Sequence, residues 1–193
     1  MLKALKLLSL FIFMSMLMSG SCDDSDSSSS LSIPIDGIQI DIPQFVIGTE
    51  ASSVNKVASE SDYFNFSSEP VEIKITDEMF SSVSSYIKSL KYVTVKSATI
   101  TATGKDAEGN NVEGYVKDLS ITSVGLSDSF EISYYSLGNA YSTKELNTYV
   151  QTAFDNLIQG QTIDFAVSGS TNVPAGTIMN YKIIINSVFE VNL

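Results

Sequence analysis

The side chains that most often carry out catalysis are scarce in this sequence. It contains no histidine, its single cysteine is Cys22, and all eleven of its basic residues are lysine. Without histidine, the chain lacks the usual general base of serine and cysteine hydrolases and the commonest zinc ligand. Without arginine, it has no bidentate clamp for phosphate or carboxylate groups. We therefore expect no catalytic residue, no metal site and no cofactor.

Carboxylates and phenols remain as groups that could do chemistry. A glycoside hydrolase needs two carboxyl groups at a set separation across a cleft, and twenty-two acidic residues supply chance pairs without that geometry. Segment 106–111, Asp-Ala-Glu-Gly-Asn-Asn, carries oxygen ligands that calcium could use. Its glycine is fourth, whereas an EF-hand loop requires glycine at the sixth position. A hairpin turn explains every residue of this segment.

Aromatic rings are the best candidates for recognition. Tyr134 and Tyr135 are adjacent in a predicted strand, so their side chains point to opposite faces and one should be exposed. Tyr141 is expected in the loop before a predicted helix, and Asn139 lies two residues before Tyr141. Exposed tyrosines can stack on sugar rings or anchor a protein partner. Alternatively, these rings have a structural role and cover the edge of the core. The absence of tryptophan makes sugar binding by these tyrosines less favoured than protein binding.

The first 21 residues have the three parts of an export signal. Lys3 and Lys6 form a positive start, an apolar run occupies 7–18, and Ser19-Gly20-Ser21 forms a small-residue cleavage region. The run is shorter than the roughly 20 residues that span a bilayer. We therefore predict a signal peptide over 1–21.

Residues 19–22, Ser-Gly-Ser-Cys, resemble a bacterial lipobox, with serine where that family prefers leucine. The resemblance implies that Cys22 bears the lipid and becomes the first residue of the mature chain. Ordinary signal peptidase also accepts these small residues and would release a soluble protein. The lone cysteine at the cleavage point favours the lipid-bearing form, whose acyl chains would attach the protein to a membrane.

Residues 22–32 form an acidic, serine-rich tether. The tether is similar to the acidic stretch that follows the lipid-bearing cysteine in surface-exported lipoproteins of Bacteroidetes-type bacteria. That resemblance implies a place in the cell envelope, anchored at the outer membrane and exposed at the cell surface, although a plain linker has the same composition. The formal charge of −11 excludes a basic footprint for nucleic acid.

Alternating apolar residues predict strands along most of 33–193. The first strand should change faces at Gly37 and lie at a sheet edge, because Pro34 and Pro43 cannot donate to a ladder. The last strand, from Met179 onwards, should be central because it is apolar on one face and partly apolar on the other. The predicted strands are centred on 33–42, 64–66, 71–75, 92–104, 112–124, 130–134, 163–167 and 179–193.

Two segments have helical periodicity. Phe80, Val83, Ile87 and Leu90 predict a helix of about four turns over 77–91. Residues 142–145, Ser-Thr-Lys-Glu, form a capping box before a wide apolar stripe that ends at Gly160. We place Ser142 at the N-cap of this second helix.

These elements predict a mainly β protein, a single domain over 33–193. We expect an antiparallel two-sheet β-sandwich of about eight strands with two short amphipathic helices. The architecture resembles the β-sandwich lipoproteins of Bacteroidetes, which implies no specific activity. Our first hypothesis is a non-catalytic, lipid-anchored binding or scaffolding module. The alternatives are a carrier of an apolar ligand between the sheet and the capped helix and, last, a carboxylate-based glycoside hydrolase.

Overall fold

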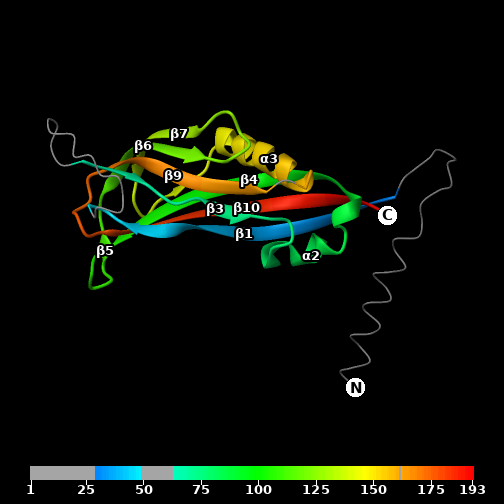
Figure 1. Cartoon of the computed structure of the whole chain (residues 1–193), viewed down its shortest axis with the longest axis horizontal. Helices are drawn as coiled ribbons and strands as arrows, with labels where there is room; N and C mark the ends of the chain where they lie inside the picture. The colour runs from blue at the N-terminus through cyan, green and yellow to red at the C-terminus, as the bar shows by residue number, and fades with distance from the viewer. Residues whose placement is uncertain (1–28, 49–62, 161) are drawn as a thin grey trace, which may run out of the picture.

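The computed structural model describes residues 29–48, 63–160 and 162–193. Within these residues, two five-stranded antiparallel sheets pack face to face, so the predicted β-sandwich is confirmed (Figure 1). The predicted signal peptide and Cys22 lie outside the described residues, as does most of the predicted tether. The first strand begins at Ser30, three residues earlier than the predicted start of the domain.

Sheet A contains the longest strands of the described part of the chain. Its order is β1 (Ser30–Val46), β10 (Ile178–Asn192), β4 (Leu90–Lys105) and β5 (Asn111–Val112), and β8 (Ala140–Tyr141) also pairs with β4. As predicted, β10 is central and β1 lies at the edge. The register of β1 shifts between Ile35 and Ile38, and Gly37 between them has a positive φ of 71°. The predicted change of face at Gly37 is therefore confirmed.

Sheet B is built from shorter strands. Its order is β2 (Phe64–Ser67), β9 (Ile163–Thr171), β6 (Tyr115–Thr122) and β7 (Phe130–Ser136), and β3 (Val71–Ile73) also pairs with β9. The strand predicted over 112–124 is two strands, because the chain leaves sheet A after Val112 and enters sheet B at Tyr115. Gly114 lies at this crossing, where an added Cβ would come within 2.6 Å of Val173. A side chain at this position would collide with the neighbouring loop.

The turn between β4 and β5 is a hairpin turn, as predicted for 106–111. The Asp106 Oδ1 atom accepts hydrogen bonds from the backbone N–H groups of Glu108 and Asn110, at 3.1 and 2.7 Å. These bonds lower the pKa of Asp106, with the bond from the Asn110 side chain as the largest cause. The carboxylate therefore holds the turn together.

Two aromatic clusters belong to the core of the fold. The rings of Phe45, Phe66 and Tyr181 join β1, β2 and β10, with centroids 5.2 to 5.9 Å apart. Phe80 meets Phe154 at 6.1 Å and Phe189 at 6.0 Å, both edge to face. Such pairs add about 1 kcal/mol each beyond the burial of their area. The first cluster thus joins the two sheets, whereas the second joins Phe189 of β10 to residues outside both sheets.

Helix α3 (Lys144–Ile158) packs beside β4 and protects its edge. Asn147 Oδ1 accepts from the Ala98 N–H, and Gln151 Oε1 accepts from the Val95 N–H, both at 2.7 Å. The Gln151 amide also donates to the Val93 carbonyl at 2.9 Å. These side chains satisfy backbone groups that a neighbouring strand would otherwise pair.

The predicted cap of this helix is wrong by one residue. Thr143, not Ser142, is the N-cap, and its hydroxyl accepts from the Leu146 N–H at 3.2 Å. The Ser142 hydroxyl instead donates to the Ala98 carbonyl on β4, so a tertiary hydrogen bond removes it from the capping position. Gly160 follows the helix with a φ of 79°, in agreement with the predicted C-terminal end.

The other predicted helix, over 77–91, is also wrong as a continuous element. The segment forms two 3₁₀ turns, η1 (Glu78–Phe80) and η2 (Ile87–Ser89), around a single α-helical turn, α2 (Ser81–Ser84). Serines between the apolar residues compete for backbone hydrogen bonds and lower helix propensity. The apolar stripe still reaches the core, because Phe80 and Val83 are fully buried.

Candidate functional site

The structure places the four residues predicted to bind a ligand in different environments. Tyr134 is 55% exposed, whereas Tyr135 is buried, so the expectation that one of the pair is exposed is confirmed. The Tyr135 hydroxyl accepts from the Ala102 N–H at 2.8 Å and donates to the Asn139 carbonyl. Tyr135 therefore joins the two sheets and does not face solvent, which corrects its place in the predicted site.

Tyr141 and Asn139 also differ from the prediction. Tyr141 was expected in a loop, but it belongs to β8 and pairs with Ile100. Its ring is half-buried near Phe130, with centroids 6.5 Å apart. Asn139 is exposed in the turn before β8, where its backbone contacts Tyr135. Of the four residues, Tyr134 alone presents a largely exposed aromatic ring.

Tyr134 belongs to a surface group that we call the tyrosine cluster: Tyr63, Tyr115, Lys117 and Tyr134. The Tyr115 ring lies 4.8 Å from the Tyr134 ring and 5.8 Å from the Tyr63 ring. Lys117 places its ammonium group 5.0 Å from the centre of the Tyr63 ring, within cation–π distance. The rings are tilted to one another by 35° and 59°, so they form an uneven surface instead of a flat platform.

The pairing of sheet B brings these residues together. Lys117 pairs with Tyr134 across β6 and β7, so the two side chains share one face of the sheet. Tyr115 has the same parity as Lys117 in β6 and lies on that face too. Tyr63 directly precedes β2, which pairs with the opposite side of β9. The cluster thus forms on the outer face of sheet B.

Lys117 sets the charge of the tyrosine cluster. A hydrogen bond with the Tyr115 side chain, more than desolvation, raises the pKa of Tyr63 to about 12. The Tyr63 phenol is therefore neutral at physiological pH. Lys117 supplies the positive charge of the cluster, on a chain with a formal charge of −11.

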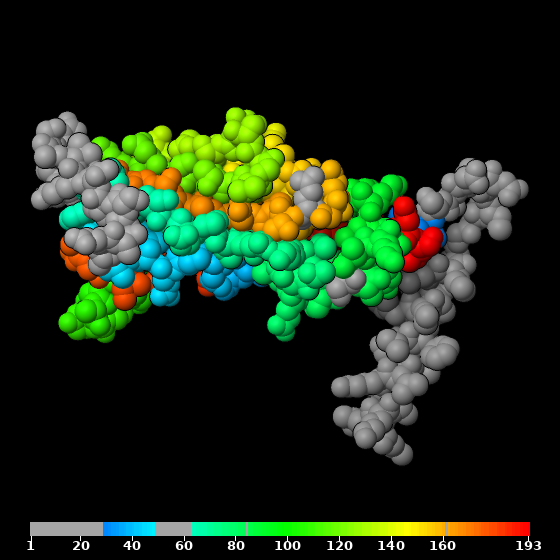
Figure 2. Space-filling view, viewed as in Figure 1, coloured from blue at the N-terminus to red at the C-terminus, as the bar shows by residue number. Residues whose placement is uncertain are grey.

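The tyrosine cluster lies far from the entry of the chain into the fold. The Tyr115 N–H donates to the Asn172 side chain at 2.8 Å, which places the cluster beside the loop that joins β9 and β10. That loop, orange in Figure 1, lies at one end of the long axis. The start of β1 and the end of β10 lie at the other end, where the Leu193 N–H donates to the Ser29 carbonyl. Figure 2 shows the same separation between the orange loop and the red end of β10.

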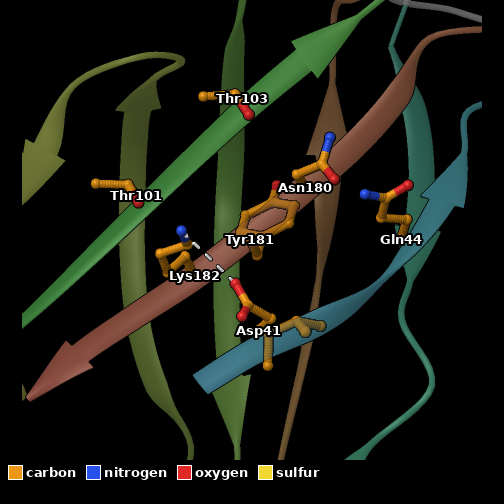
Figure 3. A pocket seen from close by; sticks show the side chains of 8 residues that line it. Asp41, Gln44, Thr101, Thr103, Asn180, Tyr181 and Lys182 are labelled. Atoms are coloured by element: carbon orange, nitrogen blue, oxygen red, sulfur yellow. Dashed lines mark ion pairs between the residues drawn. The ribbon is translucent and has the colours of Figure 1, made fainter. Parts of the chain in front are cut away.

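A second candidate site is a hollow on the outer face of sheet A, with a volume of about 380 Å³ (Figure 3). We call it the polar hollow and define it by its polar side chains. These are Asp41, Gln44, Thr101, Thr103, Asn180 and Lys182. No local pattern in the sequence indicates this hollow, because its residues come from β1, β4 and β10 and meet only through the register of the sheet.

The wide apolar stripe of α3, which suggested a carrier of apolar ligands, is explained by packing in the core. Five of its seven apolar residues are buried in the common core, and the other two pack against it. The polar hollow holds one carboxylate, Asp41, whose Oδ1 atom lies 3.8 Å from the Lys182 ammonium group. A glycoside hydrolase would need two carboxyl groups across such a space. Neither alternative gains support from these features.

Comparison with protein-family models, with curated proteins and with solved structures gave no significant match. Among the described residues, none of the helices is both long and apolar enough to cross a membrane. The same residues contain no group of three or more acidic side chains or cysteines placed to hold a metal ion. The fold shows that the protein is a β-sandwich. Its resemblance to Bacteroidetes lipoproteins remains a prediction from the sequence.

Proposed function

We propose that this chain is a non-catalytic, lipid-anchored protein of the bacterial cell envelope. In this proposal Cys22 holds it at the outer membrane, and the tyrosine cluster binds a protein partner. The observation that carries the proposal is the distance between the cluster and the entry of the chain. Ser29 lies seven positions after Cys22, a span of at most about 25 Å. The anchor would therefore keep the Ser29 end near the membrane and direct the cluster away from it.

The shape and chemistry of the cluster favour a protein partner. Tyrosine is enriched at protein interfaces because its ring buries a large apolar area while its hydroxyl keeps a hydrogen bond. The tilted rings of Tyr63, Tyr115 and Tyr134 suit an irregular protein surface better than the flat face of a sugar ring. Lys117 adds a positive charge that would attract an acidic group of the partner.

Site-specific photo-crosslinking in intact cells tests the partner. A photoreactive phenylalanine analogue replaces Tyr134 in one variant and Tyr92 in a matched control. Tyr92 is similarly exposed, at 46% against 55%, but it lies on β4 in the other sheet. We expect a discrete protein adduct from position 134 and none from position 92. Equal adducts from both positions, or none from 134, would contradict the proposed interface.

Protease treatment of intact and lysed cells tests the location. Digestion of the domain in intact cells would support exposure at the cell surface. Protection in intact cells, with digestion after lysis, would place the domain inside the envelope. Replacement Cys22→Ala should release the protein from the membrane fraction if the anchor is lipid. A variant that stays in the membrane fraction would contradict lipid anchoring at Cys22.

A further inference from the structure

The polar hollow contains side chains from three neighbouring strands of sheet A. Figure 3 shows Asp41 and Gln44 on β1, Asn180 and Lys182 on β10, and Thr101 and Thr103 on β4. Lys182 pairs with Asp41 on one side and with Thr101 on the other, and Asn180 pairs with Thr103. Side chains on one face recur about every 7 Å along a strand and about 5 Å between strands. The hollow is thus a regular array of polar groups.

Several of these polar groups are available to a ligand. Within the described residues, four side chains of the hollow make no hydrogen bond to the protein. These are Gln44, Thr101, Thr103 and Asn180. Each hydroxyl and each carboxamide can both donate and accept. The hollow therefore offers donors and acceptors together over a partly enclosed surface.

The charges of the hollow balance. The Oδ1 atom of Asp41 lies near the Lys182 ammonium group. The Oδ2 atom of Asp41 accepts a hydrogen bond from the Gln39 amide at 2.7 Å. One carboxylate with both oxygens engaged is a weak site for a metal cation. An anionic ligand would meet the repulsion of a chain with a formal charge of −11. Both kinds of charged ligand are therefore disfavoured.

We propose that the polar hollow binds a neutral saccharide, with the hydroxyls of Thr101 and Thr103 and the carboxamides of Gln44 and Asn180 bonding the sugar hydroxyls. A sugar carries many groups that both donate and accept, which matches the side chains in the hollow. Its volume, about 380 Å³, lies at the lower end of the range for small-molecule sites, about 300 to 1,000 Å³. This site lies on the other sheet from the tyrosine cluster, so the inference is independent of the proposed function.

Backbone amide NMR with neutral sugars tests the proposal directly. The isotope-labelled domain is titrated with methyl glycosides of glucose, galactose, mannose and xylose and with N-acetylglucosamine. We expect chemical-shift changes centred on Thr101, Thr103 and Asn180 for at least one sugar. The affinity should not change between low and high salt, because neither the ligand nor the balanced hollow has a net charge. No change at these residues for any of the sugars would overturn the proposal.

Threonine-to-valine replacements separate binding from folding. The double variant Thr101→Val, Thr103→Val keeps the β-branched shape that suits a strand and removes two hydroxyls. It should weaken the affinity about tenfold. Thr94→Val, on the same face of β4 but outside the hollow, should leave the affinity unchanged. An equal loss of affinity in the double variant and in Thr94→Val would overturn the proposed saccharide site. Tighter binding of a uronic acid than of the neutral sugar would overturn it too.

Discussion

Tyr135 and Tyr181 are both buried between the sheets, but their hydroxyl groups differ in their partners. The Tyr135 hydroxyl bonds the Ala102 N–H and the Asn139 carbonyl and so links β7 to β4 and to the turn before β8. The Tyr181 hydroxyl is buried without a hydrogen-bond partner among the described residues. An unpaired buried hydroxyl costs free energy because it leaves water without compensation.

Phenylalanine replacements should therefore change stability in opposite directions. We expect Tyr181→Phe to raise the free energy of unfolding by about 1 kcal/mol, because it removes an unsatisfied group and keeps the ring. Tyr135→Phe should lower it by about 1 to 3 kcal/mol, because it leaves the Ala102 N–H without its partner. Urea denaturation of both variants measures the difference. A loss of stability in Tyr181→Phe would show that its hydroxyl has a partner.

The candidate sites show why sequence reasoning at the residue scale was incomplete. Adjacent residues on a strand face opposite ways, so an exposed ring in the Tyr134–Tyr135 pair could be predicted, but not which one. Tyr63, Tyr115 and Tyr134 lie in different segments, and only the pairing of sheet B joins them. No local pattern in the sequence carries that register.

At the scale of elements, α3 serves as the edge partner of β4. Exposed strand edges invite pairing with other chains, and proteins often cover them with a helix or loop. Here the coverage includes specific hydrogen bonds from Asn147 and Gln151 to the strand backbone. The helix therefore contributes polar contacts as well as its apolar stripe.

Gln151→Ala tests this role. The change removes the acceptor of the Val95 N–H and the donor to the Val93 carbonyl, and we expect a loss of about 2 kcal/mol in the free energy of unfolding. Thr152→Ala is the control, because this exposed threonine bonds only to the preceding turn of its own helix. Its effect should stay within about 0.5 kcal/mol. Similar losses in thermal or chemical denaturation of the two variants would contradict the edge contact.

Elements with repeated, consistent patterns were predicted well. The alternation of β10 continues over most of its length, and the stripe of α3 is wide and ends at a glycine. Segment 77–91 has the same helical spacing, but its serines weaken the helix and its apolar residues reach the core without a regular helix. The cap at Thr143 was missed because Ser142 bonds to a strand that is distant in sequence.

The whole molecule should lose stability in alkaline solution. Burial raises the pKa of Tyr149 to about 12 and that of Tyr181 well above its ordinary value of 10. The unfolded chain loses these protons near pH 10, whereas the folded chain retains them. The folded state then binds more protons, so the stability present below pH 10 falls as the pH rises toward 12.

Thermal unfolding as a function of pH measures this effect. Tyr149→Phe should give a shallower decline in Tm above pH 10, because it removes one of the groups that titrates differently in the two states. If the plot of Tm against pH for Tyr149→Phe overlays that of the unchanged protein, Tyr149 does not contribute to the alkaline loss of stability.

The pairing of β1 with β10 has a consequence for how the chain folds. Within the described residues, β10 is the only strand of sheet A that lies beside β1, and it also separates β1 from β4. During synthesis, β1 emerges before the rest of the sandwich and β10 emerges after it. The strand β1 therefore cannot pair within sheet A until β10, near the C-terminal end of the described residues, has been made. Folds dominated by such distant pairings assemble slowly, over about milliseconds to seconds. The growing chain would thus carry β1 without its sheet partner until β10 is made.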